Sequence, residues 1–74
     1  MKKKANRIND IVGGNIRKIR IVQKLSQNHL AYETGLTREF INKVENGKNN
    51  ISITKLALIA EALNISLKRL VDKV

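Results

Sequence analysis

The chain has 74 residues, enough for one small domain, and its 42% hydrophobic content supports only a limited core. It contains no cysteine, so disulfides and thiolate metal sites are excluded, and its net charge of +9 is typical of a protein that binds a polyanion. Its single histidine, His29, leaves no catalytic or metal-binding cluster, so we expect no enzyme activity, cofactor or metal.

The positive charge is concentrated in the first third of the chain. Residues 1–24 contain eight of the basic residues and a single acidic one, Asp10. Residues 1–7 are polar and basic, and we expect a flexible arm there, followed by one domain over residues 8–74. No apolar run approaches the roughly 20 residues that span a bilayer. We therefore expect a soluble, cytoplasmic protein without a membrane partner, and no small-molecule ligand is evident.

The first predicted helix covers about residues 8–22, where the apolar side chains recur at helical spacing. They are Ile8, Ile11, Val12, Ile16, Ile19 and Val22. Gly13 and Gly14 weaken the first turns, so the firm part of this helix is expected to begin near them.

Two shorter helices follow, each with its own start and stop signal. Ser26 is a natural N-cap for a helix over residues 27–34, which Gly35 ends. Thr37 is the next cap, for a helix over about residues 38–46, and Gly47 ends that one. Two helices of this length with one glycine turn between them predict a helix-turn-helix, and a generic αα-hairpin is the alternative.

Two further helices complete an all-α domain. Ser52 or Thr54 caps a helix that Asn64 ends, and Ser66 caps a short final helix. The predicted fold is therefore a compact five-helix domain containing a helix-turn-helix.

Specific positions extend this outline into a family resemblance. They are Ser26-Gln27, Leu30-Ala31, Gly35-Leu36-Thr37, Ile41, Glu45-Asn46-Gly47-Lys48 and Ala60-Glu61-Ala62-Leu63. In these positions the chain resembles the phage repressor and Cro-type (lambda repressor-like) helix-turn-helix domain, and within it the restriction–modification controller proteins. The resemblance covers about residues 13–72. It implies a regulator that binds double-stranded DNA, with the third helix in the major groove.

Helical geometry selects the side chains that would meet bases. With Ile41 and Val44 turned inward, the opposite face of the third helix carries Arg38, Glu39, Asn42 and Lys43. An ordinary solvated surface is the alternative for each of them. Phe40 is apolar and lies beside this face, where it contacts either DNA or the neighbouring helix and loop.

A second group of residues is expected to hold the DNA backbone. The resemblance assigns Gln27 this role, and most of the remaining candidates are polar or basic residues on the first helix, around the third helix and in the loop after it. Phe40 is the exception, an apolar side chain that could touch sugar carbons. This group comprises Gln27, Arg17, Lys24, Thr37, Phe40, Asn46, Lys48, Asn49, Asn50 and Ser52.

Two further features are expected, an ion pair that the resemblance implies and a dimer. Arg20 and Glu45 match a buried arginine–glutamate ion pair that joins the first helix to the third. One module makes few base contacts, so a homodimer on a palindromic operator is expected. Its interface is predicted at the last helix and the chain end, at Leu67, Leu70, Val71 and Val74, because Leu67, Val71 and Val74 cannot all enter so small a core. The alternative is that Leu67 and Leu70 close the core and Val74 frays.

The favoured function is that of a small dimeric repressor or autoregulator. An activator would also need a contact with RNA polymerase, which the sequence does not show. The main alternative is an antitoxin that binds a toxin protein as well as its own promoter, and co-purification with a toxin distinguishes the two. A basic first helix lying on anionic lipid is a third reading, disfavoured because Ile16 and Ile19 are needed in the core.

Overall fold

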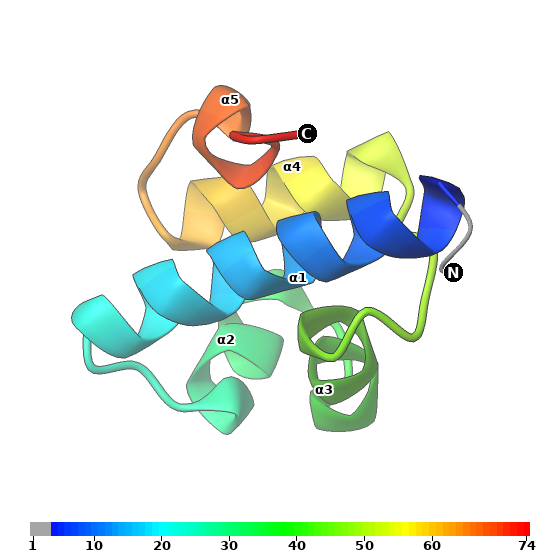
Figure 1. Cartoon of the computed structure of the whole chain (residues 1–74). Helices are drawn as coiled ribbons and strands as arrows, with labels where there is room; N and C mark the ends of the chain where they lie inside the picture. The colour runs from blue at the N-terminus through cyan, green and yellow to red at the C-terminus, as the bar shows by residue number, and fades with distance from the viewer. Residues whose placement is uncertain (1–3) are drawn as a thin grey trace.

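The computed structural model describes residues 4–74, which form five helices joined by short turns (Figure 1). They are α1 (Lys4–Val22), α2 (Gln27–Thr34), α3 (Arg38–Glu45), α4 (Ile53–Ala62) and α5 (Leu67–Leu70). α1 packs against α3 and α5, and α4 packs against α2 and α5. In Figure 1, α2 and α3 lie at the bottom and α5 at the top. The predicted all-α, five-helix architecture is confirmed.

Three of the helices begin at hydroxyl side chains. The side-chain oxygens of Ser26, Thr37 and Ser52 accept hydrogen bonds from the backbone N–H three residues later, at 2.9, 3.0 and 3.1 Å. Each cap satisfies one of the N–H groups that a helix leaves open at its first turn. Ser52, and not Thr54, therefore caps α4. Ser66 stands at the N-cap of α5 without a side-chain bond, and its carbonyl accepts from the Arg69 N–H instead.

The turn between α2 and α3 depends on Gly35. Its φ of +73° lies in the left-handed region, and its N–H reaches back to the carbonyls of Ala31 and Tyr32. A side chain is disfavoured in this conformation, whereas glycine adopts it readily. The glycine thus lets the chain turn directly from α2 into Thr37 and α3.

The start of α1 differs from the prediction in two ways. Lys4–Arg7 form the first turn of α1, so the helix begins before the predicted start at Ile8; residues 1–3 of the predicted arm lie outside the described part. The helix also continues through Gly13, which is buried. Its backbone lies so close to α3 that an added Cβ would collide with the backbone carbonyl of Val44. Gly13 is therefore a point of close packing between α1 and α3, and not a helix start.

Every helix contributes a fully buried side chain to the core. The largest of these are Ile16, Leu30, Ile41, Ile59, Leu63 and Leu70. Leu70 is thus a core residue and cannot belong to a dimer interface, which corrects its predicted role; so small a domain needs α5 to close its core. Within residues 4–74, no helix has both the length and the apolar character needed to cross a bilayer.

Candidate nucleic-acid interface

α3 is divided sharply into an anchored side and a free side. Ile41, Val44 and Glu45 are buried, which fixes the helix on the domain. The opposite side projects into solvent and carries the four predicted base-reading residues, all exposed: Arg38, Glu39, Asn42 and Lys43. The structure thus presents a polar row on a helix that is held rigidly from behind.

The expected pair of Arg20 and Glu45 is present behind α3. Arg20 Nε and Nη2 donate to the two Glu45 carboxylate oxygens at 2.7 and 2.9 Å, and Nη1 donates to the Leu25 carbonyl at 2.7 Å. The Glu45 side chain is only 1% exposed. The hydrogen bonds that Glu45 accepts raise the pKa of the Arg20 guanidinium, outweighing the lowering by burial. The guanidinium group of Arg20 therefore joins α1, the loop before α2 and the end of α3.

The carboxylate also orients polar side chains that lead toward the surface. Gln27 Nε2 donates to Glu45 Oε1 at 3.1 Å, and Gln27 Oε1 accepts from Asn42 Nδ2 at 3.4 Å. Asn46 Nδ2 in turn donates to the Asn42 carbonyl and side-chain oxygen, each at 2.9 Å. Gln27, Asn42 and Asn46 thus form a chain that links the buried ion pair to the edge of the exposed row.

Phe40 is half-buried and packs against the core from the start of α3. Lys55, in the first turn of α4, holds its ammonium group 4.8 Å from the centre of the Phe40 ring. A cation over an aromatic face is attracted by the ring quadrupole. Lys55 was not among the predicted site residues; its backbone N–H donates to the Ser52 cap at the start of α4.

The loop from α3 to α4 carries the remaining predicted backbone contacts. Lys48 is exposed, whereas Asn49 is half-buried. The Asn50 side-chain oxygen accepts from Asn9 Nδ2 of α1 at 2.7 Å, a contact that joins segments far apart in the sequence. At Gly47 the φ is +70°, and an added Cβ would collide with Asp10 of α1. The loop is thus held against α1 at two points.

The other predicted residues lie on α1 and the turn after it, on α2 and at the C-terminal end of the chain. Arg17 and Lys24 are exposed on α1 and the turn after it. Val71 and Val74 are 38% and 53% exposed, whereas Leu67 packs partly against the core. His29 Nε2 lies 3.3 Å from Glu33 Oε1, one turn along α2. Within residues 4–74, no group of three or more His, Cys, Asp or Glu side chains is placed to hold a metal ion.

Comparison with known proteins identifies sequences and structures that are similar to this chain. The family model HTH_3, described as "Helix-turn-helix", matches residues 16–70. The Control protein C.SmaI of Serratia marcescens is 36% identical over 66 residues, which cover 89% of this chain and 79% of that protein. The crystal structure of the restriction-modification controller protein C.AhdI from Aeromonas hydrophila superposes with a TM-score of 0.82 at 34% identity, covering 84% of this chain and 94% of that one.

A third relative has been solved on DNA. The restriction-modification controller protein C.Esp1396I, as a tetramer in complex with its natural 35 base-pair operator, superposes with a TM-score of 0.76 at 34% identity. The match covers 80% of this chain and 78% of that one. The similarity therefore extends over nearly the whole helical domain, including α2, α3 and the turn between them.

Proposed function

Since this chain belongs to the HTH_3 helix-turn-helix family, we propose that it is a DNA-binding transcriptional regulator of the controller type. The relatives in the comparison are control proteins, and one of them is bound to its operator as a tetramer. The present chain is proposed to recognise a double-stranded operator in the same general manner, as a repressor or autoregulator. Its excess of positive charge supports a polyanionic partner.

The observation that carries this proposal is the division of α3 into two sides. A helix enters the major groove only if it protrudes and its exposed face is polar. α3 meets both conditions, because Ile41, Val44 and Glu45 anchor one side while the other is open to solvent. We therefore place the N-terminal part of α3 in the major groove.

Each exposed residue on α3 has a distinct proposed role. Arg38 stands at the start of the helix and donates its fork to guanine O6 and N7, a contact worth about 1–3 kcal/mol of discrimination. Glu39 accepts from a cytosine amino group, and Lys43 donates to guanine or to a phosphate. Asn42 is assigned to adenine at the edge of the contact, since its amide also bonds to Gln27 and Asn46.

Backbone contacts are proposed on both flanks of α3. Gln27 and Thr37 stand at the starts of α2 and α3, where backbone N–H groups favour phosphate. On the other flank, Ser52 caps α4 and Lys48 is exposed in the loop. The remaining members of this group are Arg17, Lys24, Phe40, Asn46, Asn49 and Asn50, to which we add Lys55. These contacts fix position and do not read sequence.

The regulator is proposed to act as a symmetric homodimer. One α3 contacts few bases, so two copies on half-sites about one helical turn apart supply the specificity. Leu67, Val71 and Val74 remain the proposed contact, without Leu70, which is buried in the core. The tetramer of C.Esp1396I on one operator supports binding by several copies.

The test is selection of bound sites from random double-stranded DNA, followed by titration at several salt concentrations. We expect a consensus with two-fold symmetry and an affinity that falls steeply as salt rises, because cations on the protein displace counterions from the phosphates. A salt-independent affinity, or a pool that never converges on a consensus, would refute the proposal.

A further inference from the structure

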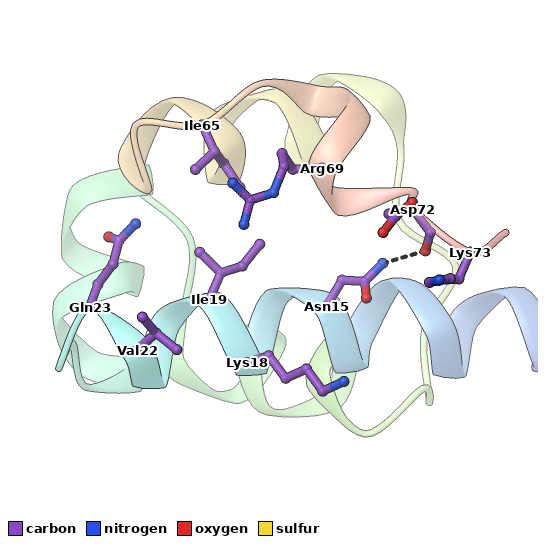
Figure 2. Close-up of a pocket in the computed structure, with 9 residues that line it drawn as sticks. All are labelled: Asn15, Lys18, Ile19, Val22, Gln23, Ile65, Arg69, Asp72 and Lys73. Carbon is purple, nitrogen blue, oxygen red and sulfur yellow. Dashed lines mark hydrogen bonds between the residues drawn. The ribbon is translucent and has the colours of Figure 1, made fainter.

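A cleft of about 370 Å³ lies between α1 and α5 (Figure 2). In Figure 1, α5 lies at the top of the domain and α3, the proposed DNA-binding helix, at the bottom. Its apolar walls are Ile19 and Val22 of α1 and Ile65 of the turn before α5. Val22 is 80% exposed, although it continues the apolar spacing of α1. The cleft thus leaves aliphatic side chains exposed to solvent, although so small a domain has few apolar side chains for its core.

Three cations surround these walls. Lys18 comes from α1, Arg69 from α5 and Lys73 from the turn that follows it. Figure 2 shows the Arg69 side chain reaching from α5 toward α1, into the space near Ile19. None of the three forms an ion pair with a carboxylate within residues 4–74, and Asp72 is the single acid in the lining. The cleft therefore has a net positive rim.

The two walls are tied together by side-chain amides. Asn15 Nδ2 on α1 donates to the carbonyls of Leu70 and Asp72 at 3.0 and 2.8 Å. At the other end, Gln23 Nε2 donates to the Leu63 carbonyl at 2.7 Å. These bonds hold the C-terminal turns against α1, so the cleft exists before any partner arrives and little ordering cost is expected on binding.

We propose that this cleft docks an acidic segment of a protein partner. An aliphatic side chain of that segment would lie between Ile19 and Ile65, and flanking carboxylates would meet Lys18, Arg69 and Lys73. Nucleic acid fits less well, because the lining has no aromatic ring for base stacking. The site goes beyond the proposed DNA binding, and it leaves α3 free, so both partners would bind at once.

The test uses a fluorescein-labelled peptide in which glutamates flank two leucines, titrated with the full chain and followed by anisotropy. The informative variant is Arg69→Glu, and its matched control is Lys68→Glu, an exposed neighbour outside the cleft. Both variants carry the same net charge, so non-specific attraction falls equally in each. We expect Arg69→Glu to weaken peptide binding about tenfold more than Lys68→Glu, because it adds repulsion at the docking point.

A second pair of variants tests the apolar walls. Val22→Ser should weaken binding, whereas Ile21→Ser, a 51% exposed neighbour outside the lining, should not. Amide NMR shifts on adding peptide should be largest at Asn15, Ile19 and Ile65. Absence of binding, equal losses in the two charge variants, equal affinity for a peptide with serines in place of the leucines, or shifts centred on α3 would each overturn the proposal. Binding to selected DNA should be retained in all four variants, and its loss in Arg69→Glu and Val22→Ser but not in their controls would overturn the cleft proposal. Absence of selected DNA binding in the wild type would count against the DNA proposal alone.

Discussion

Replacing Arg20 by alanine should cost this domain a large part of its stability. The substitution removes both hydrogen bonds from the guanidinium to Glu45 and the third one to the Leu25 carbonyl. Within residues 4–74, the Glu45 carboxylate, 1% exposed, would then keep only the hydrogen bond from Gln27 Nε2 at 3.1 Å. A buried charge left without its partner costs about 3–5 kcal/mol.

That cost is large relative to the stability of a small domain. At roughly 0.05–0.15 kcal/mol per residue, a chain of 74 residues has about 4–11 kcal/mol of unfolding free energy. We therefore expect Arg20→Ala to be largely unfolded, or to unfold at far lower urea concentration than the wild type, with far-UV circular dichroism as the signal. DNA binding should fall with the folded fraction and not beyond it.

The matched control is the double variant Arg20→Met with Glu45→Leu. It removes both charges and fills the space with apolar groups, so most of the stability lost in Arg20→Ala should return. An Arg20→Ala protein with wild-type stability and poor DNA binding would refute the reasoning, since Arg20 would then act at the DNA and not in the scaffold.

The Arg20–Glu45 ion pair also predicts how the free energy of unfolding changes as the pH rises. The pKa of Arg20 is raised in the folded state, so its contribution is fully present below the ordinary pKa of arginine and is lost as the pH rises through the raised value. Urea midpoints measured from neutral to mildly alkaline pH should therefore show no loss from this pair. A decline that is absent in the double variant would contradict the assignment.

Three further changes test other parts of the molecule. Gly13→Ala should destabilise the domain by about 1–3 kcal/mol in thermal unfolding, because the added Cβ would strike the Val44 carbonyl. Gly14→Ala, with open space around it, should be neutral or stabilising by up to about 1 kcal/mol. Equal effects of the two substitutions would argue against the close approach of α1 and α3 at Gly13. Arg38→Ala should relax preference at one base position in a site selection, whereas Lys48→Ala should weaken all sequences about equally and lower the salt slope; the same pattern of loss in both would contradict the separation of base and phosphate contacts. Val71→Lys should shift the sedimentation of the protein toward monomer while the circular dichroism spectrum stays native, and an unchanged dimer would place the interface elsewhere.

The sequence by itself determined the features that depend on neighbouring residues, namely the helix caps, the glycine turn and the two sides of α3. Ser26 and Thr37 bond to N–H groups three residues away, and Gly35 adopts its left-handed conformation within a single turn. Apolar spacing likewise sorted α3 into a buried side with Ile41 and Val44 and an exposed row that begins at Arg38. Such features depend on residues a few positions apart, so one chain contains all the information needed to predict them.

Only the tertiary structure decided the contacts between distant segments. Gly13 looked like a weak helix start and is the point where α1 meets the carbonyl of Val44. Lys55, which the sequence did not single out, lies over Phe40, while Leu70, predicted at the dimer interface, closes the core. These outcomes depend on which helix faces meet and how closely, and helical periodicity shows that a face is apolar without showing what will cover it.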